Sequence, residues 1–121
     1  MATLNLNRFK EELKHFTGSN CIYKHPLSKG RYTEGVQFVA SQLGAYWLLD
    51  LIFLLQVNHH RLDTSFQVWK LRVGEERTAT LTMEDGDGTP VLSHDIDATD
   101  FPLSEFTFWL IDNVLLLPSE H

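Results

Sequence analysis

One apolar run, from Leu43 to Val57, constrains the fold more than any other feature of the sequence. Its apolar residues follow the helical period and, after Gly44, surround nearly the whole helix. A helix that is apolar on every side is buried on every side, so we expect a central helix, capped at Thr33, against which the other elements pack. A membrane span needs about 20 apolar residues, and this run is shorter and is interrupted by Asp50.

Periodicity and composition also predict what precedes this helix. Apolar residues at helical spacing predict an amphipathic helix over residues 5–16. Residues 17–32 are rich in Gly, Ser and Lys, which indicates a connecting loop with a brief strand at Ile22. In the central helix, Gly44 marks either a kink or a close contact with a sheet.

After the central helix the pattern changes to alternation of apolar and polar residues. This period of two predicts strands over residues 65–73, 77–83 and about 90–96. Residues 106–117 form either two short strands around a turn at Asp112–Asn113 or a helix followed by a strand. No repeat or linker divides the sequence. We therefore predict one α+β domain, residues 1–121, in which two N-terminal helices, the second central and buried, pack on an antiparallel β-meander of four or five strands.

The charge of the chain is divided unevenly along the sequence. Residues 1–60 hold six basic and four acidic residues, a net charge of +2, whereas residues 61–121 hold four basic and twelve acidic residues, a net charge of −8. Nucleic-acid phosphates repel an acidic face, so we expect the acidic half to bind a basic surface of another protein. The candidate binding residues are Glu84, Asp85, Asp87, Asp95 and Asp97.

Composition excludes several classes of protein and predicts a cytoplasmic location. A chain that is 43% hydrophobic and 12% aromatic is not disordered. The single cysteine cannot close an intramolecular disulfide, and the N-terminal residues lack the apolar stretch of a secretory signal. Oligomeric state is open, although Phe106, Phe108 or Trp109 on an outer sheet face would favour a dimer.

Residues that could carry chemistry are few. Cys21 lies between His15 and His25 in sequence, and a nearby histidine can activate a thiol, so a small enzyme using Cys21 or an acidic cluster is one alternative. The favoured role of Cys21 is a small buried hydrophobe. A basic loop over residues 24–31 leaves weak nucleic-acid binding as another alternative, but it lacks a glycine-rich phosphate motif.

No metal or cofactor is predicted. His59 and His60 are adjacent, and adjacent side chains do not share a face of a helix or strand. The acidic groups at residues 84–88 and 94–100 offer carboxylates to a divalent cation, but neither matches a calcium-binding loop, and turn chemistry explains the first.

Asp50 is the least expected residue of the central helix, because burying an unpaired carboxylate is costly. We expect a structural role, in which Asp50 pairs with Arg31, Lys70 or a Trp indole N–H, or lies on a solvated edge of the helix. A perturbed acid in a cleft is the functional alternative.

Six strings, in order over about residues 16–120, together resemble a family of short bacterial and phage proteins known only as a domain of unknown function. They are Phe16–Ser19, Tyr32–Val36, Gly44–Asp50, Phe66–Leu71, Thr99–Leu103 and Leu115–Glu120. The resemblance implies no catalytic residue, cofactor or substrate, and it implies a context of bacteria, phages and mobile elements. It also places Asp50 and Asp100 in distinctive strings, which favours structural roles, with Asp100 as a turn former. We expect a non-enzymatic interaction or regulatory protein.

Overall fold

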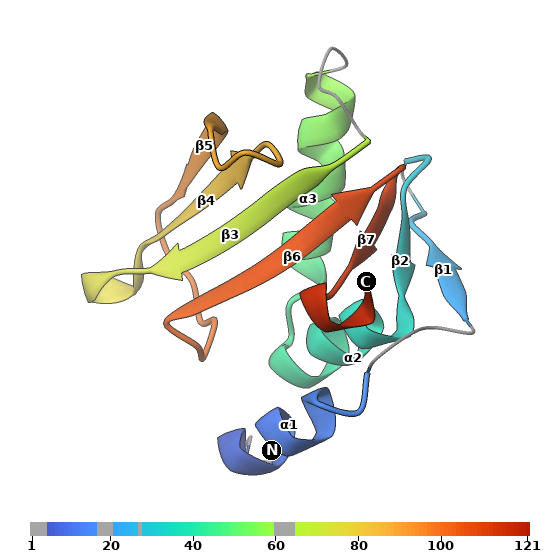
Figure 1. The fold of residues 1–121 in the computed structure, drawn as a ribbon. Helices are drawn as coiled ribbons and strands as arrows, with labels where there is room; N and C mark the ends of the chain where they lie inside the picture. The colour runs from blue at the N-terminus through green and yellow to red at the C-terminus, as the bar shows by residue number, and fades with distance from the viewer. Residues whose placement is uncertain (1–4, 17–20, 27, 60–64) are drawn as a thin grey trace.

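A mixed sheet of seven strands, covered on one face by helices, forms the core of the molecule (Figure 1). The computed structural model describes residues 5–16, 21–26, 28–59 and 65–121. The helices are α1 (Leu6–Leu13), α2 (Glu34–Leu43) and α3 (Tyr46–Asn58), with short 3₁₀ helices η1 (Glu75–Arg77) and η2 (Pro118–Glu120). The strands are β1 (Ile22–Lys24), β2 (Arg31–Thr33), β3 (Gln67–Val73), β4 (Ala79–Glu84), β5 (Pro90–Ile96), β6 (Glu105–Ile111) and β7 (Val114–Leu116).

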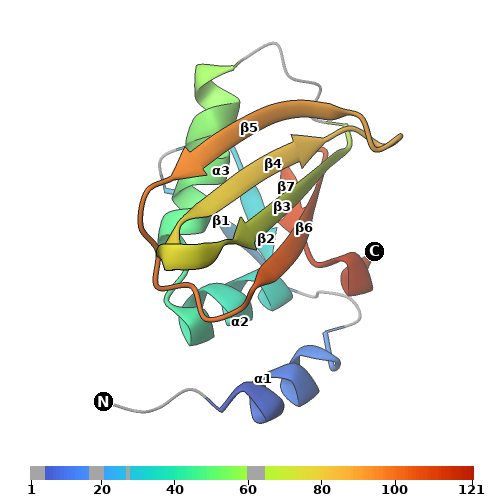
Figure 2. The ribbon, with the colours of Figure 1, turned by 90° about the vertical axis from the view of Figure 1, so that its left-hand side faces the viewer.

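The predicted N-terminal helix is present as α1, which packs on α2. The side chain of Asn5 caps its start by accepting the backbone N–H of Arg8 at 3.1 Å. Phe9 is the buried residue of α1, and its ring stacks on Phe38 of α2 with centroids 5.4 Å apart. The helix therefore lies against α2, away from the sheet (Figure 2).

The central helix is two helices rather than one. Thr33 caps the first as expected, accepting the backbone N–H of Val36 at 3.3 Å. At Gly44 the backbone takes a left-handed conformation, φ 61°, which ends α2. A Cβ there would meet no neighbouring atom, so Gly44 is required by the turn and not by a close contact with the sheet.

Burial of α3 is less complete than the sequence predicts. Leu48, Ile52 and Phe53 are fully buried against the sheet. Tyr46, Leu54 and Val57 are exposed, because the sheet covers only one side of the helix. Within the described residues, no helix combines the length and the apolar character needed to cross a membrane.

The sheet has more strands than predicted and is not a simple meander. The run β3-β4-β5 is antiparallel as expected, but β6 pairs with β3 instead of β5. The connection over residues 97–104 causes this, since it crosses one end of the sheet with Phe101 fully buried. Strand β1 confirms the brief strand expected at Ile22, whereas β2 lies where a loop was expected. Both extend the sheet, and the parallel pairing of β2 with β7 makes it mixed.

The last two strands follow the first of the two alternatives. Asp112 and Asn113 form the turn between β6 and β7, and both adopt positive φ, 50° and 67°. Asn and Asp tolerate this conformation, which tight hairpins require.

The face of the sheet that the helices cover carries the core, including Trp69, Leu71, Leu81 and Phe108. Gln67 is buried there too, exchanging hydrogen bonds with Gln56 and accepting the Trp69 indole N–H at 2.9 Å.

The residues proposed for a dimer divide between the two faces. Phe106 and Phe108 lie on the covered face of β6, whereas Trp109 lies on the open face. Trp109 is half-buried between the rings of Phe66 and His121, with centroids 5.5 and 5.4 Å away.

Glu120 joins the last turn of the described chain to the start of α2. Its carboxylate accepts the hydroxyl of Thr33 at 2.6 Å and the backbone N–H groups of Leu117 at 3.0 Å and Gly35 at 3.3 Å. Three donors from two segments therefore hold one charge at this corner.

Candidate functional site

The predicted acidic binding residues lie on the β4–β5 hairpin, but at its two ends. Glu84, Asp85 and Asp87 are at the turn, whereas Asp95 and Asp97 are at the far end of β5. At about 3.3 Å per residue, β5 separates the two groups by about 20 Å. The structure therefore does not gather all five residues into one site.

At the turn, two of the three acidic side chains are engaged. Glu84 pairs with Lys70 on the open face of the sheet, Oε1 to Nζ 3.2 Å. Asp85 accepts the backbone N–H groups of Asp87 and Thr89, each at 2.9 Å. The carboxylate of Asp85 thus shapes the turn, and Asp87 is the exposed acid of this group.

The far end of β5 belongs to a larger cluster. There η1 links β3 to β4, and the connection over residues 97–104 passes the same end of the sheet (Figure 2). Six exposed acidic residues meet here, which we call the acidic end: Glu75, Glu76, Asp95, Asp97, Asp100 and Glu105. None of the six forms an ion pair with another residue that the structure describes.

Two arginines lie at the acidic end without neutralising it. The guanidinium of Arg77 donates to the backbone carbonyls of Thr99 at 3.1 Å and Phe101 at 2.6 Å, so it holds the connection in place. Arg72 is exposed and lies opposite Glu105 in the sheet register. Six carboxylates against two guanidiniums leave this end strongly negative.

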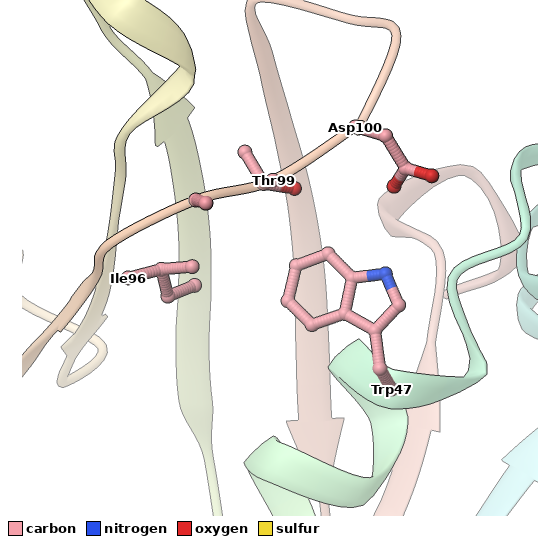
Figure 3. Close-up of a pocket in the computed structure, with 5 residues that line it drawn as sticks. Trp47, Ile96, Thr99 and Asp100 are labelled. Atoms are coloured by element: carbon pink, nitrogen blue, oxygen red, sulfur yellow. The ribbon is translucent and has the colours of Figure 1, made fainter.

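A groove of about 380 Å³ opens beside the acidic end. Its lining residues are Trp47, Ile96, Ala98, Thr99 and Asp100. The indole of Trp47 rises from the first turn of α3 towards the connection, and Asp100 lies above its pyrrole side (Figure 3). The backbone N–H of Phe101 bonds to the hydroxyl of Thr99 at 3.1 Å, so Thr99 makes the turn contact expected of Asp100.

Strand β5 is an edge of the sheet. It pairs with β4 alone, and its side chains are mostly exposed, with Val91 at 50%. An edge strand directs alternate backbone N–H and C=O groups outward, where another extended segment can pair with them. The acidic end therefore flanks a row of available hydrogen-bonding groups.

Asp50 pairs with a residue that the sequence did not single out as its partner. Its Oδ1 lies 2.7 Å from Nε2 of His25, whose side chain is 2% exposed and whose ring packs on Phe53 with centroids 4.7 Å apart. The other ring nitrogen, Nδ1, lies 2.9 Å from Oγ of Ser28. The contact joins residues on the β1–β2 connection and on α3, which only the fold brings together.

The order Ser28, His25, Asp50 matches that of a hydrolytic triad, but the surroundings do not. Ser28 Oγ accepts the backbone N–H of Gly30 at 3.1 Å, so a tight turn holds the hydroxyl. The histidine is buried while the Asp50 side chain is 49% exposed, the reverse of a triad in which the serine faces substrate. The arrangement fixes the loop against α3.

Cys21 is exposed, which corrects the expectation of a buried side chain. A hydrogen bond to the Glu34 side chain, together with the negative charge of that carboxylate, raises the pKa of the Cys21 thiol. A raised pKa disfavours the thiolate, which is the nucleophilic form. Glu34 thus works against the enzyme alternative that uses this thiol.

The remaining predicted candidates do not assemble into a site. His59 is exposed at the end of α3, and His60 lies outside the described residues. In the basic loop, Lys24, Lys29 and Arg31 are exposed while His25 is engaged with Asp50. Over residues 5–16, 21–26, 28–59 and 65–121, no three His, Cys, Asp or Glu side chains are placed to hold a metal ion.

Comparison with known proteins identifies a family and no individual relative. A model of a family of unknown function, DUF6876, matches residues 7–121. Neither the curated proteins nor the solved structures contain a match to this chain.

Proposed function

We propose that this chain, which belongs to the DUF6876 family of unknown function, is a non-enzymatic interaction protein that binds a basic, extended segment of another protein along β5. The observation that carries the proposal is the position of the acidic end beside an exposed edge strand. Action as a regulator in bacteria, phages or mobile elements is the context that we infer for this binding.

Backbone and charge contribute separately to such binding. An extended segment added to an edge strand gains main-chain hydrogen bonds, which supply affinity for any sequence. Carboxylates at the end of the strand select a basic segment and speed its association. Asp87 lies at one end of β5, and Asp95 and Asp97 lie at its other end. These carboxylates would therefore contact the two ends of such a segment.

The charge distribution supports a protein partner over a nucleic acid. The acidic end would repel phosphates, and its six carboxylates exceed the three exposed basic residues of the loop over residues 24–31. These three are Lys24, Lys29 and Arg31, and they belong to the opposite edge of the sheet, at β1 and β2.

The test uses a defined peptide of about eight residues that alternates Lys and Val, a length that matches β5. Titration calorimetry at low salt should detect binding that weakens as the salt concentration rises, because mobile ions screen charges beyond about 10 Å at 0.1 M. The matched control peptide replaces each Lys with Glu and should not bind. Absence of binding by the Lys peptide at low salt would overturn the proposal.

Two further measurements separate backbone pairing from charge. A Lys peptide with an N-methyl group on every backbone amide has no N–H to donate to an edge strand and should bind at least about 10-fold more weakly. The Asp95→Asn, Asp97→Asn double variant should weaken binding of the unmodified peptide, whereas Asp112→Asn, in the exposed β6–β7 turn, should not. Equal binding of methylated and unmodified peptides would exclude pairing along β5.

A further inference from the structure

We propose that the groove between Trp47 and Asp100 binds the side chain of an arginine in the basic segment. This inference rests on the proposed function and names the residue that anchors the partner. It concerns the groove of about 380 Å³ at the end of β5, where strand, connection and helix meet.

The position of the groove links it to the edge strand. Ile96, the last residue of β5, forms one wall, so a segment paired along β5 reaches the groove at one of its ends. Trp47 projects into the groove from α3, and Asp100 stands across from it on the connection (Figure 3). A side chain leaving the paired segment would enter between an aromatic ring and a carboxylate.

The chemistry of these two walls fits a guanidinium. An arginine head group is planar and stacks on an indole face, where the ring quadrupole attracts the cation. Its N–H groups also bind a carboxylate through two parallel hydrogen bonds. Asp100 is exposed and makes no hydrogen bond or ion pair with its side chain among the residues described, so it is available for this contact.

Lysine fits the same groove less well. Its ammonium group is a strongly hydrated point charge that cannot stack on the ring or bind both carboxylate oxygens in a fixed geometry. The remaining carboxylates of the acidic end attract either cation, so they do not distinguish arginine from lysine. Discrimination should therefore depend on Trp47 and Asp100.

The test compares three peptides that differ only in their two terminal residues. Each alternates Lys and Val along the length of β5 and carries Arg, Lys or citrulline at both ends, so that either strand direction delivers that residue to the groove. We expect the Arg peptide to bind wild type about 3- to 10-fold more tightly than the Lys peptide, with citrulline weakest.

Variants assign the preference to the groove. Trp47→Leu and Asp100→Asn should each lower affinity for the Arg peptide by about 3- to 10-fold and abolish the advantage of Arg over Lys. The matched controls are Trp109→Phe, on the open face, and Asp112→Asn. A urea midpoint equal to that of the wild type would show that a variant is folded. If Trp47→Leu does not fold, Asp100→Asn still tests the groove, because it breaks no described contact.

The outcomes separate this inference from the proposed function. If the Lys peptide binds along β5 but Arg gives no advantage, or if Asp100→Asn retains that advantage, the groove assignment is wrong and the proposed function stands. A capped single arginine cannot pair as a strand, so its titration tests the groove alone. A shift of the Trp47 indole resonance on adding it, absent in Asp100→Asn, would support the groove even if the Lys peptide failed to bind; no shift would overturn the groove.

Discussion

Carboxylates near the β1–β2 edge of the sheet and those at the acidic end have opposite surroundings. Asp50 meets the buried ring of His25, and Glu120 accepts three hydrogen bonds from Thr33, Gly35 and Leu117. The six carboxylates of the acidic end are exposed and form no ion pair with a described residue. The number of nearby hydrogen-bond donors explains why the two groups have different roles. A carboxylate surrounded by donors stabilises the fold, whereas a carboxylate without an ion pair stays available to a partner.

The largest expected difference between the two regions is in stability. Glu120→Ala should lower the free energy of unfolding by about 2–3 kcal/mol, because it removes the shared acceptor of two donors at the start of α2 and of the Leu117 N–H before η2. The matched change at the acidic end, Asp97→Ala, should alter it by less than about 0.5 kcal/mol. Urea denaturation followed by tryptophan fluorescence measures both. Similar values for the two variants would remove the distinction between the regions.

A smaller effect is expected from the contact between His25 and Asp50. A double-mutant cycle with His25→Ala and Asp50→Ala should give a coupling energy of about 1 kcal/mol, since one partner is buried and the other half-exposed. The control cycle uses Arg8 and Glu12, an exposed pair on α1 that should give about 0.3–0.5 kcal/mol. If the buried pair couples no more strongly than the exposed one, burial of His25 adds nothing to the contact.

The smallest effect concerns Cys21, an exposed group that is nevertheless controlled by a neighbouring side chain. Because Glu34 raises the pKa of the thiol, less thiolate forms at a given pH than in a free cysteine. Glu34→Gln should lower that pKa and speed alkylation by a few-fold near pH 8. The rate of reaction with iodoacetamide across pH measures the shift. The control Glu11→Gln, an exposed change on α1, should leave the alkylation rate unchanged. If Glu34→Gln reacted at the wild-type rate, Glu34 would not control the pKa of the thiol.

Local periodicity predicted α1 and the strands β3, β4 and β5, and it left the turn at Asp112–Asn113 as one of two alternatives. These elements are long enough, or marked well enough by turn residues, for their pattern to be read from neighbours in sequence. Strand β1 was expected as a brief strand at Ile22, but β2 was not predicted. Its three residues are too few to show a period, and a parallel partner, β7, far along the chain stabilises it. The break at Gly44 was ambiguous because the flanking apolar pattern continues through it.

The candidate site was predictable only in part, because its geometry depends on contacts between segments that are distant in sequence. The acidic residues could be named from charge, but their division between the two ends of β5 follows from the register of the hairpin. The groove beside Trp47 could not be predicted, since the connection over residues 97–104 forms its other wall and passes beside the start of α3 only in the fold. Similarly, the pairing of Asp50 with His25 needs the β1–β2 connection to reach α3.

The parallel pairing of β2 with β7 also has a consequence for synthesis on the ribosome. Arg31 and Tyr32 align with Val114 and Leu115, and Glu120 binds the start of α2, so early segments find their partners in the last part of the described chain. Contacts between distant segments form late and slow folding. During synthesis, the edge of β2 that pairs with β7 therefore stays unpaired until β7 has emerged from the ribosome.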